Sequence, residues 1–360
     1  MKKSLVALAV LAAAGAASAQ SSVTLFGIVD ATLAHGSGSL TDSTRLANSG
    51  YNSSRLGFRG TEDLGGGMAA SFWLEAGFNN DDGTGQGSNT NNQATGNAPA
   101  AAGGQGLTFA RRATVSLSGG WGEVRLGRDY TSTFRNIGSF DPFGYNGVGT
   151  TVIAARSILG TASVVQVRVS NSFGYFLPAK LGGFYGQAQI YLGENAQNGA
   201  ATEDDGKGWN FRLGYAAGPF NIALAHNNLE LAAGDIKTTN IGGQWDFRVA
   251  KLLANYQRDR QSGVASGRGY LIGGLIPVGA GEVRLSYSEY KVDNNAAAAL
   301  DPRARKMAIG YVHNLSKRTA LYASYARVKN SGGSATALNA STTAANASSS
   351  GYDFGVRHSF

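Results

Sequence analysis

The sequence contains no cysteine, few prolines and no long apolar segment after its N-terminal end. Its 360 residues include six prolines against 52 glycines. The lack of cysteine excludes disulfide cross-links, which a chain of this length does not need in order to fold. No run of about 18 apolar residues follows Gln20, which excludes a bundle of membrane-spanning helices.

The N-terminus has the three parts of a secretory signal. Two lysines follow Met1, Leu5–Ala14 form a short apolar run, and Ala17-Ser18-Ala19 form an A-x-A cleavage site. The apolar run is too short to cross a bilayer as a helix. The pattern predicts a signal peptide over residues 1–19 and an exported mature chain over residues 20–360.

The formal net charge is +8, and the loss of two lysines with the signal peptide leaves +6. Such a net positive charge is compatible with nucleic-acid binding. However, the arginines are scattered singly through alternating segments, and an exported protein rarely meets nucleic acid. A channel whose interior attracts anions explains the charge better, so no nucleic-acid partner is predicted.

The last ten residues, GYDFGVRHSF, alternate strictly between two kinds of side chain. Tyr352, Phe354, Val356, His358 and Phe360 occupy every second position. This period of two is typical of a strand with one apolar face. An amphipathic strand that ends on an aromatic residue fits the closing strand of an outer-membrane β-barrel, with an edge strand of a soluble domain as the alternative.

Alternating segments recur along the whole chain, and most are about ten residues long, enough to cross a membrane at a tilt. Short connections such as Leu64–Gly67 alternate with long polar ones such as 81–107 and 131–162. Short periplasmic turns and longer external loops are expected of a bacterial barrel. Sixteen strands are predicted, at 22–35, 52–63, 68–80, 108–119, 122–130, 163–177, 183–192, 208–217, 220–230, 236–247, 249–260, 268–278, 281–293, 304–315, 318–329 and 351–360.

Each strand is predicted to place its apolar face outward and its polar face inward. In the first strand, Val23 and Leu25 share one face, and Thr24 and Asp30 share the other. This arrangement is the reverse of a soluble barrel, and lipid-facing backbone must be fully paired, so the sheet has to close. At about sixteen strands, side chains cannot fill the interior and an aqueous channel remains. The predicted fold is therefore an all-β, sixteen-stranded antiparallel transmembrane barrel in the outer membrane.

Several segments resemble the general diffusion porins of Gram-negative bacteria, of the β-proteobacterial type. They are SVTLFG from Ser22, SRLGFRGTEDLG from Ser54, LGR at 126–128, DPF at 141–143 and NLSKRT at 314–319. The resemblance spans essentially the whole mature chain. It implies a homotrimer in contact with lipopolysaccharide and outer-membrane lipid. It also implies a third loop folded inward to constrict the pore, and recognition of Phe360 by the barrel-assembly machinery.

Strand parity identifies the charges that should line the pore. Arg55 and Arg59 alternate with apolar neighbours on the second strand, and Arg112 and Arg168 do so on the fourth and sixth. In the related porins, a cluster of arginines faces the inward-folded loop, and Arg55, Arg112 and Arg168 match those positions. Arg125 is a weaker addition. Each arginine has an alternative reading, in which it only pairs with a carboxylate such as Glu75 or Asp30.

The third loop adds two more cations, Arg135 and Arg156, against a single carboxylate, Asp141. A net positive constriction concentrates anions, so the sequence predicts a passive channel for small solutes and ions with a preference for anions. Arg111 and Arg128 have outward parity near the external rim, and we expect them to contact lipid phosphates.

Two other functions compete with this prediction. Catalysis is not expected, because the four histidines form no short motif with serine or aspartate, and neither a metal site nor a cofactor is predicted. A substrate-specific channel for small organic anions or phosphate is the stronger alternative, since a ladder of arginines suits that task too. Pore diameter, the role of the long second loop and any adhesin or phage-receptor role stay open.

Overall fold

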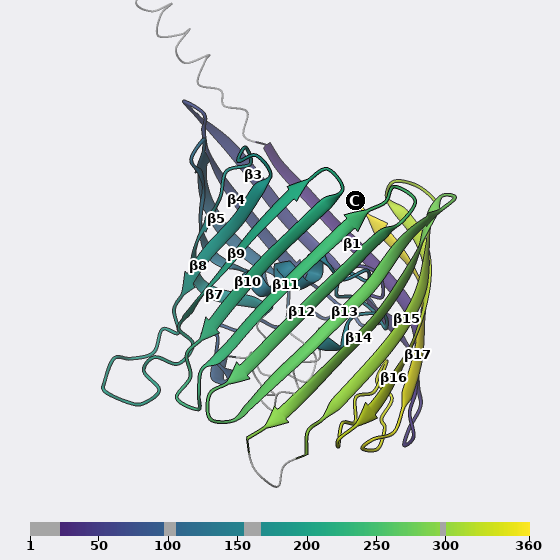
Figure 1. The fold of residues 1–360 in the computed structure, drawn as a ribbon. Helices are drawn as coiled ribbons and strands as arrows, with labels where there is room; N and C mark the ends of the chain where they lie inside the picture. Colours follow the sequence, from purple (N-terminus) through teal and green to yellow (C-terminus); the bar gives the residue numbers. More distant parts are fainter. Residues whose placement is uncertain (1–21, 97–105, 155–166, 296–299) are drawn as a thin grey trace, which may run out of the picture.

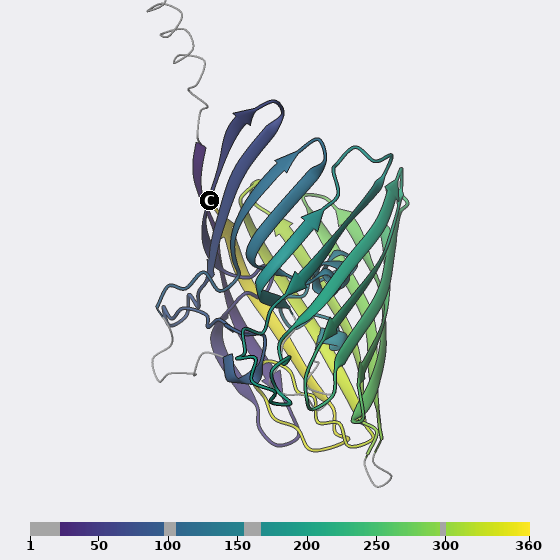
Figure 2. The same ribbon diagram turned by 90° about the vertical axis from the view of Figure 1, so that its left-hand side faces the viewer.

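A computed structural model describes residues 22–96, 106–154, 167–295 and 300–360, and shows a closed β-barrel (Figures 1 and 2). Within these ranges, all strands belong to one antiparallel sheet. The sheet closes because β1 (Ser22–Ser37) pairs with β17 (Ser349–Ser359), with Ile28 opposite Ser359. The predicted signal peptide and Arg156 lie outside the described residues.

The strands between these two pair mostly with their neighbours in sequence. They are β2 (Ser43–Asn48), β3 (Arg55–Gly65), β4 (Met68–Gly77), β5 (Arg112–Gly119), β6 (Gly122–Tyr130), β7 (Arg168–Phe176), β8 (Phe184–Tyr191), β9 (Gly208–Ala217), β10 (Phe220–Leu229), β11 (Ile236–Asp246), β12 (Lys251–Gln261), β13 (Ala265–Val278), β14 (Gly281–Asn294), β15 (Arg303–Asn314) and β16 (Thr319–Ser331). The described ranges also contain three short helices: η1 (Ala94–Gly96), α2 (Ser132–Ser139) and η2 (Val152–Ala154). None of the helices in the described ranges is long and apolar enough to cross a membrane.

The seventeen strand segments form sixteen strands of the barrel. β3 pairs with the first half of β1, from Ser22 to Ile28, and β2 pairs with the second half, from Ala31 to Gly36. β2 and β3 are therefore two parts of one interrupted strand. The prediction of a sixteen-stranded barrel is confirmed, but β2 lies between the predicted strands 22–35 and 52–63, where no strand was predicted.

Exposure alternates along the strands as the sequence predicts. On β1, Val23 and Leu25 are 67% and 54% exposed, whereas Asp30 and Thr32 are buried. On β12, Leu252, Ala254 and Tyr256 are exposed, whereas Leu253 and Asn255 between them are buried. The outer surface is therefore an apolar band, and the polar side chains line the lumen.

The two ends of the barrel differ in the length of their connections. β3 and β4 are joined by a tight turn in which Gly65, Gly66 and Gly67 all have positive φ, a conformation that suits glycine. The C-terminus lies at this end, and the longer loops lie at the opposite end (Figure 1). This asymmetry is typical of a bacterial barrel, with the short turns on the periplasmic side.

The described part of the third loop, residues 131–154, runs along the inner wall of the barrel. It begins with α2, whose N-cap Thr131 accepts a hydrogen bond from the Phe134 amide. α2 packs against β8 to β11, and η2 packs against β13 to β15. The coiled ribbon of α2 is drawn within the barrel outline (Figure 1).

Apolar contacts attach the far half of this loop to the wall. Phe143, Val148 and Val152 form one buried cluster with Leu271 and Tyr290 of β13 and β14. Burying such side chains contributes about 1.5–3 kcal/mol each. The loop is therefore fixed against the wall that includes β8 to β11 and β13 to β15, and leaves the wall formed by β3 to β7 open toward the lumen.

Candidate functional site

A cavity of about 680 Å³ lies between the third loop and the wall formed by β3 to β9. Its lining includes Asn48, Ser53, Tyr130, Phe134 and Tyr145. Five arginines from five separate parts of the chain also line it, and none of the described lining residues is a carboxylate; the arginines are Arg55, Arg111, Arg135, Arg168 and Arg212. The space therefore presents cations to any solute that passes.

Glu75 of β4 lies behind this cavity and is 3% exposed. Its Oε1 accepts a hydrogen bond from Arg111 Nε at 2.6 Å and contacts Arg55 Nη1 at 3.4 Å. Its Oε2 accepts a hydrogen bond from Trp73 Nε1 at 3.0 Å. One buried carboxylate thus compensates two arginines, as the alternative reading of Arg55 expected.

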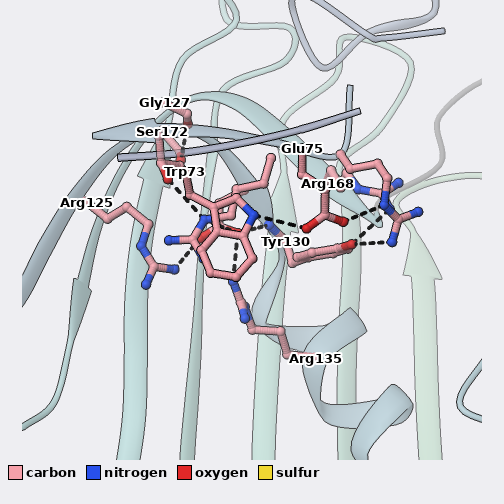
Figure 3. Close-up of polar contacts among 12 residues, drawn as sticks. Trp73, Glu75, Arg125, Gly127, Tyr130, Arg135, Arg168 and Ser172 are labelled. Carbon is pink, nitrogen blue, oxygen red and sulfur yellow. Dashed lines mark hydrogen bonds and ion pairs between the residues drawn. The ribbon is translucent and has the colours of Figure 1, made fainter. Parts of the chain in front are cut away.

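The hydroxyl of Tyr130 accepts hydrogen bonds from Arg111 Nη2 at 2.8 Å and from Arg168 Nη2 at 3.1 Å (Figure 3). The Arg168 guanidinium also lies 4.6 Å from the centre of the tyrosine ring. No ion pair of Arg168 occurs within the described residues. Its charge is therefore stabilised by a neutral hydroxyl and an aromatic face, and stays electrostatically available to an anion.

A second buried carboxylate, Asp129 of β6, binds three arginines. Its oxygens lie 2.5 Å from Arg125 Nη1, 2.7 Å from Arg135 Nη2 and 4.0 Å from Arg112 Nε. Arg125 also pairs with Glu123 at 2.9 Å. Figure 3 shows Arg135 reaching up from α2 beneath Tyr130. Asp129 therefore connects the inward loop to the wall. Its single negative charge is smaller than the three positive charges of the arginines that it contacts.

The balance of charge around the narrowing is positive. Among the described residues that line the cavity or pair with Glu75 or Asp129, seven guanidinium groups meet three carboxylates, which leaves a formal excess of four positive charges: Arg55, Arg111, Arg112, Arg125, Arg135, Arg168 and Arg212 against Glu75, Glu123 and Asp129. Partly desolvated charges of one sign focus the field in the lumen.

Arg59 lies farther toward the periplasmic end of β3. Its guanidinium lies 5.4 Å from the Phe26 ring and 5.2 Å from the Trp73 ring, and Arg112 lies 4.6 Å from the same indole. Trp73 therefore stands between two cations. Arg59 faces the lumen as predicted, although it does not line the cavity itself.

The prediction that Asp141 faces the pore was wrong. Its carboxylate accepts hydrogen bonds from the loop's own backbone, from the amides of Phe143 at 2.9 Å and of Tyr145 and Thr151 at 3.3 Å. Burial raises the pKa of this carboxyl, an effect that these amides oppose. Asp141 therefore shapes the loop and contributes no acidic face to the channel.

The outward placement of Arg111 was also wrong. Arg111 precedes the first residue of β5, so strand parity does not apply to it, and its side chain turns to Glu75. Arg128 keeps its outward parity, because it lies opposite Ala113 on the face of β5 and β6 that also carries the exposed Val115 and Leu126. Its guanidinium donates to the Asn89 carbonyl of the second loop at 3.0 Å and to Ser170 Oγ at 2.8 Å.

Three contributors to the site were missed in the sequence. Arg212 has inward parity on β9 and donates to Asn136 Oδ1 of α2 at 3.0 Å, so the path of the third loop selects it. Asp129 and Tyr130 end β6 next to the loop. Both residues stand directly before a long connection in the sequence, and this position could have indicated that they lie beside the third loop.

The opposite wall carries a smaller basic pair. The guanidinium groups of Arg284 and Arg357 lie 4.5 and 5.2 Å from the ring of Tyr51. Arg284 also pairs with Glu282 at 3.1 Å.

The described part of the second loop folds back on its own barrel. The side chain of Asn92 is buried and donates to the carbonyls of Ser170, Leu192 and Gly206, at 3.0 to 3.2 Å. Gln93 donates to Asn195 Oδ1 at 2.9 Å. This segment covers the rim near β7 to β9.

A closed barrel with an apolar outside, a polar lumen and a charged narrowing is a channel of the outer membrane. The family model for Gram-negative porins matches residues 4–333, and the chain belongs to this family. The members of this family are channels.

Individual relatives are similar to this chain over most or all of its length. The chain is 39% identical to outer membrane porin protein 32 of Delftia acidovorans, with 100% of both chains covered. It is 31% identical to an outer membrane porin protein of Bordetella pertussis, over 91% of this chain and 94% of that one. The solved structure of an anion-selective porin from Comamonas acidovorans superposes with a TM-score of 0.81 at 35% identity, covering 95% of this chain and 100% of that chain.

Proposed function

We propose that this outer-membrane porin passes small anions in preference to cations. The observation that carries the proposal is the cavity beside the third loop, whose described lining contains five arginines and no carboxylate. The similar porin from Comamonas acidovorans is described as anion-selective, which supports the same direction. Diffusion through the lumen is passive, and the arginines set the charge preference.

The proposal predicts the sign of the reversal potential in a KCl gradient across a planar bilayer. The wild-type channel should give the sign for chloride. Replacing Arg55, Arg111 and Arg168 with glutamine removes three of the five cavity cations, and the potential should shift toward the cation-selective sign. The matched control replaces Arg258, Arg260 and Arg327 on the outer surface and should leave the potential unchanged. A cation-selective wild type would refute anion preference.

A substrate-specific channel for organic anions or phosphate is the second candidate. The observation that favours it is the shared Tyr130 hydroxyl, which holds Arg111 and Arg168 with donors facing the same cavity. Such a convergent pair suits a polyatomic anion. Chloride conductance that saturates and is blocked by millimolar phosphate or succinate would support this function, whereas linear, unblocked conductance supports general diffusion.

We also propose the assembly that the family implies: removal of residues 1–19 on export, insertion by the barrel-assembly machinery, and a homotrimer surrounded by lipopolysaccharide and outer-membrane lipid. The apolar outer band supports burial in lipid or against other subunits. Mass measurement of the purified native complex, together with the number of equal conductance steps per insertion, tests the trimer. A single step with monomeric mass would contradict it.

A further inference from the structure

The six residues between β2 and β3, 49–54, form a segment that is too long to lie in the barrel wall. β1 pairs with β2 up to Asn48 and with β3 from Arg55 onward, and only Val29 and Asp30 of β1 lie opposite the six residues. The segment is therefore four residues longer than a continuous strand would be at this place. We call it the 49–54 segment.

The buried carboxylate of Asp30 holds the backbone of this segment. Asp30 is 0% exposed, and its Oδ2 accepts hydrogen bonds from the amides of Tyr51 at 2.9 Å and Asn52 at 2.6 Å. Its Oδ1 accepts a hydrogen bond from the Tyr322 hydroxyl of β16 at 2.5 Å. The Asp30 amide donates to Ser54 Oγ at 3.0 Å. Hydrogen bonds to a charged acceptor are the strong ones, so Asp30 fixes the path of the segment.

The segment meets the tip of the third loop, residues 144–147, inside the barrel. Ser53 Oγ donates to Asn146 Oδ1 at 2.8 Å. The two backbones also approach closely, because a Cβ added to Gly147 would lie 2.1 Å from the Gly50 carbonyl oxygen, and Gly147 has φ +63°. A glycine permits both this approach and this backbone conformation. The segment and the loop therefore form one continuous obstruction.

This obstruction borders the cavity that the arginines line. Ser49 and Ser53 are among the lining residues of that cavity, together with the tip of the third loop. Tyr51 points elsewhere: its hydroxyl accepts a hydrogen bond from Arg284 Nη2 of β14 at 3.2 Å, and its ring centre lies 5.8 Å from that of Tyr322. The segment therefore stands between the cavity and the wall at β14 and β16, and it reduces the open cross-section of the lumen.

We propose that the 49–54 segment sets the largest solute that the pore admits, jointly with the third loop, and that Asp30 is its positioning residue. The diameter of a pore decides which uncharged solutes pass. The segment contains no charged side chain, so its effect is on size and not on charge. The inference rests on the channel function of the barrel and is independent of anion preference.

The direct test deletes Gly50–Ser53, which leaves Ser49 and Ser54 opposite the two unpaired residues of β1 and joins β2 to β3. An even number of residues is removed, so Arg55 keeps its inward direction. Wild type and variant are reconstituted in liposomes, and swelling rates are measured in the neutral sugars arabinose and raffinose. The rate for raffinose relative to arabinose should rise at least about threefold, because a wider narrowing admits the larger sugar.

The matched control deletes Gln197–Ala200, four exposed residues of the loop between β8 and β9. Its ratio of sugar rates should equal that of wild type. A folded Gly50–Ser53 deletion with the wild-type ratio would overturn the proposal, as would an equal rise in the control. The sign of the reversal potential in a KCl gradient should stay as in wild type, so this result and the test of anion preference are independent.

The role of Asp30 is tested by two substitutions. Asp30→Ala removes the acceptor of both amides, and the raffinose ratio should rise toward that of the deletion variant. Asp30→Asn keeps a carbonyl oxygen at this place and should restore most of the wild-type ratio. A lower thermal midpoint of Asp30→Ala with an unchanged ratio would show that Asp30 only stabilises the barrel, which contradicts its assignment as a positioning residue.

A chemical label decides the matter if the deletion variant does not fold. The chain contains no cysteine, so Ser53→Cys carries a single thiol beside the cavity. Labelling with a bulky neutral methanethiosulfonate should lower single-channel conductance by at least about half, because the label enters the narrowest part of the pore. Asn198→Cys, in the exposed loop between β8 and β9, is the control and should conduct as before labelling. Full labelling of Ser53→Cys without a fall in conductance would refute the proposal.

Discussion

Asp129 illustrates how a single carboxylate controls both the charge and the shape of the narrowing. It is 1% exposed and contacts Arg125 and Arg112 on the wall and Arg135 on α2. Removing one partner from a buried ion pair leaves the other partner uncompensated, at a cost of about 3–5 kcal/mol. The residue therefore stabilises the loop while lowering the positive charge of the pore.

Replacing Asp129 with asparagine should separate these two roles. Loss of one negative charge should make the reversal potential in a KCl gradient more anion-selective. Loss of the ion pair with Arg135 should also lower the thermal midpoint of the folded barrel, by an amount that corresponds to a few kcal/mol. Asp129→Glu keeps the charge and is the control. A variant that becomes less anion-selective would show that Arg135 moves out of the lumen when it is released.

Strand parity predicted the inward direction of Arg55 and Arg112, which are paired in regular register with β4. Arg168 also lines the cavity, although a register shift separates it from the regular part of the pairing between β6 and β7. The rule failed for Arg111, which lies before the first residue of β5. A register shift turns every following side chain to the other face. Neither its position nor the hydrogen bonds that hold Asp141 can be inferred from alternation alone.

At the scale of elements, the third loop is fastened to the wall through Val148. Its amide donates to Asp353 Oδ2 at 2.6 Å, and its carbonyl accepts a hydrogen bond from Lys306 Nζ at 3.0 Å. Farther along, the amide of Val152 donates to Ser288 Oγ at 3.0 Å. The side chains of Lys306 on β15 and Asp353 on β17 thus bind the carbonyl and the amide of the same loop residue, Val148.

Replacing Lys306 with methionine should loosen this attachment. A hydrogen bond to a charged group contributes about 1.5–3 kcal/mol, so the fraction of time that the loop spends detached should rise roughly 10- to 100-fold. Single-channel recording should show more frequent closures and a lower voltage threshold for closing. The matched control is Lys329→Met on the outer surface of β16, for which gating should stay as in wild type. Unchanged gating in Lys306→Met would mean that the apolar contacts alone hold the loop.

Most strands could be predicted from alternation, while irregular segments could not. The predicted strand 249–260 agrees closely with β12. The first residues of the predicted strand 163–177 lie outside the described part of the chain; β7 runs from Arg168 to Phe176, and Asn171 within it has a positive φ that alternation does not reveal. β2 is six residues long and escaped detection because so short a run carries little periodicity.

At the scale of the whole molecule, the barrel exists only if its first and last strands meet. β17 pairs with β1 over ten positions, from Ile28 opposite Ser359 to Ser37 opposite Ser350. Phe360 extends this ladder, because its amide and carbonyl exchange hydrogen bonds of 3.1 Å with Gly27. The Phe360 ring packs directly over Gly27: a Cβ added to residue 27 would lie 2.2 Å from the nearest atom of the ring. The alternation of the last ten residues predicted this closure.

Deleting Phe360 should impair assembly far more than stability. The deletion removes two backbone hydrogen bonds, each with a net contribution of about 1 kcal/mol, from a closure that retains ten register pairs. Purified chain refolded in detergent should therefore keep its heat-modifiable mobility and lose at most a few degrees in thermal midpoint. In cells the amount of barrel in the outer membrane should fall severalfold while exported chain accumulates in the periplasm. Phe360→Trp keeps a terminal aromatic and should assemble normally. Normal assembly of the deletion variant would reduce Phe360 to an interfacial aromatic, whereas failure to refold in detergent would place its role in barrel closure itself.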